Sequence, residues 1–224
     1  MTLRVPEHVP AVSAPAPEDT LDHLVYAVPD LEAGLAAFEA ATGVRPTEGG
    51  RHLGKGTRNY LVGLGPTRYL EIIGPDPDHP AEPGVQVPFG LDEVTEPRLL
   101  TWSVHPAHPE RVLAAAVAAG VDLGPLTAMS RLTTTGVTLS WRLATTFPLP
   151  LGGVVPFVID WGNTPHPAAS GLPQLELLSV SGVHPEPAVA RDVLAGMGIE
   201  LPVAAGPVGL RALLRGPRGV VELS

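Results

Sequence analysis

The feature that most constrains the fold of this chain is an order of elements, a strand, a helix and three strands, that its sequence predicts twice in full and a third time in shortened form. A pattern that recurs along a chain indicates an architecture more strongly than any single predicted element does. In the first repeat, residues 21–28 are rich in β-branched and aromatic side chains and predict a strand. Residues 29–43 place apolar side chains at helical spacing, with Asp30 suited to the helix start and Gly43 to its end.

Each repeat continues in the same order. The first repeat closes with strands predicted near 46–53, 58–65 and 67–74. The second comprises a strand at 99–105, a helix at 109–120 and strands at 126–132, 137–144 and 154–162. The third is shorter, with a strand at 175–185, a helix at 187–198 and strands at 208–216 and 219–224. We therefore predict an α+β fold of repeated βαβββ units, divided into a first unit at 20–97, a second at 98–170 and a third, shortened unit at 171–224.

Composition removes several classes of protein from consideration. The chain has 224 residues, 44% of them hydrophobic, and no apolar run approaches the roughly 18 residues of a membrane helix, so we expect a soluble, cytoplasmic protein. It has no cysteine, which excludes disulfides and thiolate metal ligands. Its formal charge is -9 and Lys55 is its only lysine, which argues against nucleic-acid binding. Residues 1–19 are rich in proline and alanine and predict a flexible arm.

Glu71 lies among apolar residues in one of the predicted strands, RYLEIIG. It shares a face of that strand with Tyr69 and Ile73, because successive side chains point to opposite sides. A buried carboxylate requires a cation or hydrogen-bond donors, or its pKa rises until it is neutral. Asp160 and Glu222 occupy similar positions in the last strands of the other two units. Any of these acids could instead face solvent or pair with an arginine, so the pattern alone leaves their role open.

Six segments carry a resemblance to a known family. They are LDHLVYAVPDLEAG, GGRHLGKGTRN, YLEIIGPDP, LSWRLA, VPFVIDWGNTPHP and GPRGVVELS. Together they resemble the glyoxalase-like domain proteins of the vicinal oxygen chelate superfamily. The resemblance implies that each unit curls into a half-barrel, that two units pair around a cavity, and that first and last strands hold a divalent metal ion inside it. It implies much less about the reaction, because this fold supports unrelated chemistries.

The resemblance also implies metal ligands, residue by residue. His23 matches the first-strand ligand of the first unit and Glu71 matches its last-strand ligand. In the second unit Thr101 stands where a histidine is expected, and Asp160 occupies the last-strand position. If the third unit pairs with the first instead, Glu222 takes the place of Asp160. The implied set of one imidazole and two carboxylates suits Mn, Fe, Zn or Ni, with positions left for water and substrate.

His52 and the residues after it form a second group of candidates. His52 lies in a glycine-rich loop and is a candidate third metal ligand, a candidate general base, or a surface histidine. Thr57, Arg58 and Asn59 supply hydrogen-bond donors beside that loop. They either bind the substrate or hold the loop in place.

Arg142 and Trp161 are the candidates from the second unit. Arg142 lies on an apolar strand and needs an anion, which is either Asp160 or an acidic group of the substrate. Trp161 is predicted to line the cavity and to contact the ligand. Four histidines that adjoin prolines match no metal-ligand spacing and are predicted at the surface: His105, His108, His166 and His184.

Three functions are compatible with this assignment. The first is a metal-dependent isomerase, epimerase or lyase, in which the ion polarises a small oxo, hydroxy or carboxylated compound while Glu71 or His52 moves a proton. The second is a metal-free protein that binds an apolar small molecule, with Glu71 satisfied by Arg142 or by backbone donors. The third is an interaction module with a filled cavity. The expected partner of the first two is a small molecule, and related scaffolds often form homodimers.

Overall fold

The computed structural model describes residues 21–224, and the arm predicted at residues 1–19 lies outside the described part of the chain. The first unit comprises β1 (Leu21–Ala27), α1 (Leu31–Thr42), β2 (Thr47–His52), β3 (Thr57–Gly63) and β4 (Tyr69–Pro75). The second comprises β5 (Arg98–Val104), α2 (Pro109–Ala118), β6 (Thr127–Leu132), β7 (Thr138–Ala144) and β8 (Phe157–Asp160). The third comprises β9 (Glu176–His184), α3 (Pro187–Gly196), β10 (Val203–Ala205), β11 (Gly209–Gly216) and β12 (Gly219–Leu223). Short 3-10 turns lie at Pro88–Glu93, Pro150–Gly153 and Pro167–Ser170.

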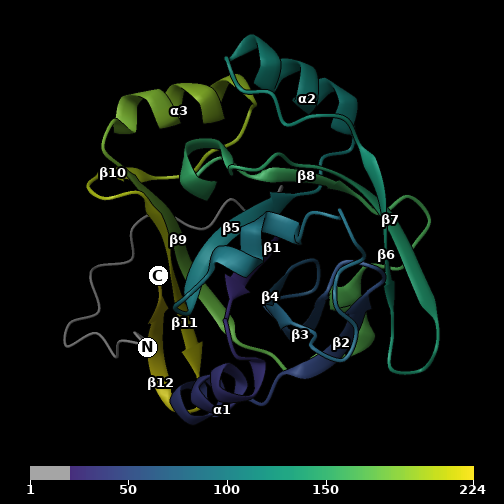
Figure 1. Cartoon of the computed structure of the whole chain (residues 1–224). Helices are drawn as coiled ribbons and strands as arrows, with labels where there is room; N and C mark the ends of the chain where they lie inside the picture. The colour runs from purple at the N-terminus through teal and green to yellow at the C-terminus, as the bar shows by residue number, and fades with distance from the viewer. Residues whose placement is uncertain (1–20) are drawn as a thin grey trace.

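The first two units close into one barrel, in the strand order β1-β4-β3-β2-β6-β7-β8-β5 (Figure 1). Within each unit the first strand pairs in parallel with the last, β1 with β4 and β5 with β8. The units join along β1 and β5, which run antiparallel, and along β2 and β6. The second joint is short, since only Arg51 with Leu132 and His52 with Arg131 are paired there. The predicted α+β fold of paired half-barrels around a cavity is confirmed.

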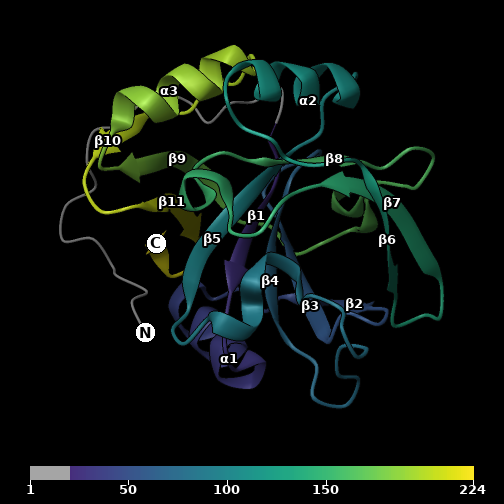
Figure 2. The same cartoon turned by 45° about the horizontal axis from the view of Figure 1, so that its top comes forward.

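The third unit repeats the order of elements but pairs its strands differently. Its sheet has the order β10-β9-β11-β12, so β9 runs parallel to the second strand of its unit rather than to the last. This sheet lies against the outside of the barrel, with β11 beside β5 and α3 beside α2 (Figure 2). Glu222 lies on its edge strand β12 and lines no part of the barrel cavity. The partner of the first unit is therefore the second.

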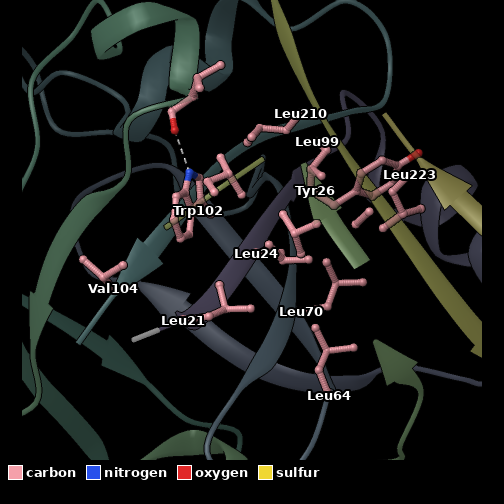
Figure 3. Packing of buried hydrophobic residues seen from close by; sticks show 14 of the residues in the cluster. Leu21, Leu24, Tyr26, Leu64, Leu70, Leu99, Trp102, Val104, Leu210 and Leu223 are labelled. Carbon is pink, nitrogen blue, oxygen red and sulfur yellow. Dashed lines mark hydrogen bonds between the residues drawn. The ribbon is translucent and has the colours of Figure 1, made fainter. Parts of the chain in front are cut away.

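Two apolar clusters separate the outside of the barrel from its inside. Leu24, Leu70 and Trp102 belong to the outer cluster, which fills the space between the barrel, the helices and the third sheet (Figure 3). Trp102 also donates its Nε1–H to the carbonyl of Val154 at 2.9 Å. The inner cluster takes alternate residues of the same strands, including Val25 of β1 and Tyr69 and Ile73 of β4. β1 and β4 are thus buried on both faces.

Local signals at the helix ends agree with the sequence. Asp30 caps α1 by accepting a hydrogen bond from the backbone of Ala33 at 3.0 Å, and Gly43 ends that helix in the left-handed conformation at φ 76°. Among residues 21–224, no helix combines the length and apolar character that crossing a membrane requires.

Candidate functional site

The barrel encloses a cavity of about 350 Å³ that is polar on one side and apolar on the other. The polar side carries the charged and polar side chains His23, His52, Asn59, Glu71 and Arg131, with Lys55 as a further lining residue. The apolar side is made by aromatic and aliphatic side chains, among them Phe89, Met129, Trp141, Phe157, Ile159 and Trp161. Tyr69, Glu71 and Ile73 all line the cavity, as the alternation along their strand predicts.

Glu71 stands between two histidines inside this cavity. Its Oε2 lies 3.7 Å from Nε2 of His23, and its Oε1 lies 3.7 Å from Nε2 of His52. Oε1 also accepts a hydrogen bond from Nδ2 of Asn59 at 2.5 Å. All four side chains are buried, so the carboxylate is shielded from bulk water. The structure brings together His23, His52, Asn59 and Glu71 from four different strands, β1 to β4.

Asp22 orients His23 from behind the cavity. The pairing of β1 with β5 is irregular between Leu21 and His23, and a bulge of this kind re-aims side chains in a strand. It allows Asp22, the next residue, to approach the ring, where its Oδ1 lies 2.5 Å from Nδ1 of His23. An ionised carboxylate only accepts hydrogen bonds, so Nδ1 carries a proton and Nε2 is the ring nitrogen directed to the cavity.

The other oxygen of Asp22 is held by residues of the second unit and its following loop. Trp161 donates its Nε1–H to Oδ2 at 2.9 Å, and Nε2 of His166 lies 3.0 Å from the same atom. Nδ1 of His105 approaches it to 3.5 Å. Burial alone would raise the pKa of Asp22, but the hydrogen bonds from His166 and His23 outweigh burial and hold that pKa well below its usual range. Asp22 is therefore an anion that positions His23.

His52 is held by Thr57 and stays neutral. Its Nδ1 lies 2.9 Å from the hydroxyl of Thr57, which leaves Nε2 as the ring nitrogen that approaches Glu71. Burial lowers the pKa of His52 to about 4, the charge of Arg131 acts in the same direction, and Glu71 opposes the change. A neutral imidazole is the form that binds a metal ion or accepts a proton.

His23, His52 and Glu71 are the side chains that could hold the metal ion that the fold family implies. Neighbouring ligands of a tetrahedral ion bound at about 2.0–2.2 Å stand roughly 3.4 Å apart, slightly less than the 3.7 Å between Glu71 and each histidine. Within residues 21–224 no three His, Cys, Asp or Glu side chains already have the spacing of a metal cluster. The two imidazoles and one carboxylate therefore fit an ion in donor type, and each histidine would have to move closer to Glu71 to reach ligand distance.

Asp160 and Arg142 lie outside the cavity, in contrast to the roles predicted for them. Two hydrogen bonds join Arg142 to Oδ2 of Asp160, the Nε one at 3.0 Å, and Glu110 lies near the same guanidinium at 3.4 Å. The hydrogen bond from Arg142 lowers the pKa of Asp160. The physical reason is alternation along the strands, because Trp141, Leu143, Ile159 and Trp161 take the inward positions and leave the outward ones to these two residues. Of the two partners predicted for Arg142, the structure shows Asp160.

Of the three hydrogen-bond donors predicted beside the glycine-rich loop, Thr57 and Asn59 belong to the site and Arg58 does not. Asn59 points into the cavity and holds Glu71, whereas Thr57 is occupied by His52. Arg58 lies on the outer face, where it pairs with Glu48 and donates to the hydroxyl of Tyr60 at 3.2 Å. Trp161 lines the cavity as predicted, and its nitrogen is directed to Asp22.

Three residues of the site escaped the sequence analysis. Asp22 was missed because neighbouring residues of a strand normally point to opposite faces. The bulge at this position explains how Asp22 and His23 contribute to one site. His166 was predicted at the surface, yet its ring contacts buried Asp22. Arg131 lies on a strand with a weak sequence signal, but the alternation of Thr127, Met129 and Arg131 was a usable sign that all three face the cavity.

Comparison with known proteins identifies the family. The family model described as a glyoxalase-like domain matches residues 21–198. No curated protein matches the chain. Among solved structures, a hypothetical protein from Staphylococcus aureus is similar with a TM-score of 0.63 at 15% identity, over 91% of this chain and 98% of that chain. This coverage extends beyond the barrel into the third sheet, and the likeness shows a shared fold.

Two enzymes of known name are more distant. Methylmalonyl-CoA epimerase from Mycobacterium tuberculosis has a TM-score of 0.39 at 17% identity, over 62% of this chain and 85% of that chain. A triple mutant of 4-hydroxymandelate synthase from Streptomyces coelicolor has a TM-score of 0.46 at 14% identity, over 92% of this chain and 62% of that chain. With the family model matching most of its length and two βαβββ units closing its barrel, the chain belongs to the glyoxalase-like domain family.

Proposed function

We propose that this protein is a divalent-metal-dependent enzyme whose ion is bound by His23, His52 and Glu71. The observation that supports the proposal is the placement of two imidazole Nε2 atoms, each 3.7 Å from a different oxygen of one buried carboxylate, inside the barrel cavity. The set differs from the one predicted from the sequence, because His52 replaces Asp160. Such a donor set suits Mn, Fe, Zn or Ni and leaves positions for a substrate.

The proposed reaction is an isomerisation, epimerisation or lyase step on a small oxo, hydroxy or carboxylated compound. When bound, the ion would act as a Lewis acid on a substrate oxygen, which contributes several kcal/mol without a nucleophilic side chain. Glu71 is the group at the ion that can accept a proton, through the carboxylate oxygen that the ion leaves free, because His52 would use Nε2 to bind the ion while its Nδ1 lies against Thr57. Asp22, Thr57 and Asn59 hold the three reacting side chains in place.

Elemental analysis of protein purified without a histidine tag or chelator tests this proposal. We expect about one divalent ion per chain in the natural protein and in Asp160→Asn, and its loss in His23→Ala and Glu71→Gln. Asp160→Asn is the matched control, because it removes a carboxylate of the same barrel that lies outside the cavity. Protein that contains no ion and takes up none of Mn, Fe, Ni or Zn would remove the metal-dependent function.

A second candidate function is favoured by the hydrogen bond between Asn59 and Glu71. Asn59 donates to Glu71 and in turn accepts from Nη1 of Arg131 at 3.1 Å, so the carboxylate is partly compensated without an ion. Under this alternative the cavity stores a small molecule and carries out no reaction. Thermal stabilisation by a ligand in the presence of chelator, with no metal in the purified protein, would support it. The cytoplasmic location and the homodimer stay predictions.

A further inference from the structure

Arg131 is a buried cation with no carboxylate partner among the described residues. It lies on β6, where its Cα pairs with that of His52, and only 4% of the residue is exposed. Its one side-chain hydrogen bond within residues 21–224 runs from Nη1 to the amide oxygen of Asn59, and its Nε has none. A buried guanidinium without an anion is unfavourable, so the fold retains a charge here that a ligand can satisfy.

The position of Arg131 is built into the barrel. Gly49 on β2 leaves room for the contact between Arg131 and Asn59, since a Cβ at Gly49 would overlap both Oδ1 of Asn59 and Nη1 of Arg131. Among residues 21–224, Glu71 is the only carboxylate that lines the cavity, and its oxygens already face Asn59 and the two histidines. No carboxylate of the described residues therefore forms an ion pair with Arg131, and its positive charge remains available to a ligand.

The cavity has the opposite charge balance from the whole chain. The chain has a formal charge of -9, but the cavity lining carries two cations, Arg131 and Lys55, against the single carboxylate of Glu71. Lys55 is held on the tight turn between β2 and β3, where Gly54 and Gly56 adopt left-handed conformations at φ 70° and 71°. The only lysine of the sequence thus lines the same cavity, where it favours the entry of an anion.

We infer that the substrate carries a carboxylate, which Arg131 binds, on an apolar body that packs against Trp141, Phe157 and Ile159. This inference rests on the proposed function in using the same cavity, and it specifies the class of substrate. Nη1 is engaged by Asn59 and Nε is buried without a partner, so the second Nη is the donor that remains for a ligand, and its charge-assisted hydrogen bond would bind an oxygen of a carboxylate. One buried guanidinium balances the single charge of a carboxylate better than the two charges of a phosphate.

Binding of phenylacetate and of its neutral analogue phenylacetamide tests the inference. Calorimetric titration of the natural protein, with and without chelator, should show at least about tenfold tighter binding of the acid than of the amide. In Arg131→Gln this preference should fall to about one, while the amide binds as before. Arg131→Lys should keep part of the preference, because the charge remains but the planar fork is lost. Arg142→Gln, which removes an arginine outside the cavity, should keep the full preference.

The ratio of the two affinities separates binding from folding, because a purely structural defect weakens acid and amide alike. An Arg131→Gln variant that keeps the preference for the acid would overturn the inference. So would a natural protein that binds both probes equally, or neither at millimolar concentration; these two outcomes need no variant to fold. The metal content is measured separately, and probe binding is compared in chelated protein, so a protein without metal can still confirm the role of Arg131.

Discussion

The two units of the barrel share one topology and place different chemistry in the cavity. The first unit contributes His23, His52 and Glu71, whereas the second contributes an apolar wall and one cation, Arg131. The pairing of strands makes the comparison direct. In the first unit His23 pairs with Tyr69, and Glu71 lies two residues further along β4. This unit holds every candidate metal ligand.

The equivalent positions in the second unit hold no ligand. Ser103, and not Thr101 as expected from the sequence, occupies the position equivalent to His23, because Ser103 pairs with Phe157 as His23 pairs with Tyr69. The residue two positions further along β8 is Ile159. Asp160 follows Ile159 and consequently points to the other face of the sheet, where Arg142 binds it. The difference shows that two units of the same topology can have different roles. The first unit carries the candidate metal ligands, and the second forms the apolar wall of the cavity.

The second unit also supports the first from behind. Asp22 of the first unit is bound by Trp161, which follows β8, and by His166 in the loop beyond. The orientation of His23 therefore depends on both units, although only one supplies the ligands.

Ile159→Glu moves the acid of the second unit by one residue, from the outer face into the cavity wall. We expect it to lower the free energy of unfolding by about 3–5 kcal/mol near neutral pH, because a carboxylate without a partner would be buried against apolar side chains. Urea unfolding measures the loss, and Ile159→Gln, similar in size but uncharged, isolates the effect of charge. Equal stability of the two variants would mean that the second unit tolerates an acid inside the barrel.

His52 should make the first unit sensitive to acid. Its folded-state pKa is depressed by burial to about 4, below the ordinary value of 6.5, so the folded state resists protonation. Its contribution is complete above about pH 6.5 and is lost as the pH falls toward about 4, by roughly 2–3 kcal/mol in total. The measurement is the free energy of unfolding in urea across this range. His52→Gln should show a shallower loss, and parallel curves for both proteins would contradict the assignment.

The order of elements was predictable from the sequence, and the pairing of strands was only partly so. Helical spacing, Asp30 and Gly43 defined α1, and the three repeated patterns located most strands. The sequence order of the third unit nevertheless suggested a third copy of the same sheet, whereas β9 pairs with β10 and β11. Strand order along a chain does not determine which edges meet, because those contacts form between distant segments.

The site was predictable where alternation was applied and missed where it was not. Alternation placed Glu71 on one face with Tyr69 and Ile73, the family resemblance placed Glu71 in the cavity, and all three residues line the cavity. The same rule applied to β8 groups Phe157, Ile159 and Trp161 and leaves Asp160 on the opposite face. Asp22 could not be found in this way, because a bulge breaks the alternation at that residue.

Trp161→Phe and Trp141→Phe compare two tryptophans of the same cavity wall. Trp161 donates its indole N–H to ionised Asp22, whereas the N–H of Trp141 has no partner in the described chain. Both substitutions remove a similar volume, so the difference between them reports the hydrogen bond. We expect Trp161→Phe to lose about 2 kcal/mol more in urea unfolding. A loss as large in Trp141→Phe would show that the support of Asp22 by the second unit is weak.

The smallest expected effect is that of Asp160→Asn, which tests the outer acid of the second unit. Exposed ion pairs contribute little to stability, and the carboxylate of Asp160 has Arg142 as its partner on the outer face. We expect the unfolding midpoint, the metal content and the affinity for phenylacetate to match those of the natural protein. Glu71→Gln makes the same chemical change inside the cavity and should alter metal content. Loss of metal in Asp160→Asn would break the division between the two units, because it would require this side chain to reach the cavity and leave Arg142.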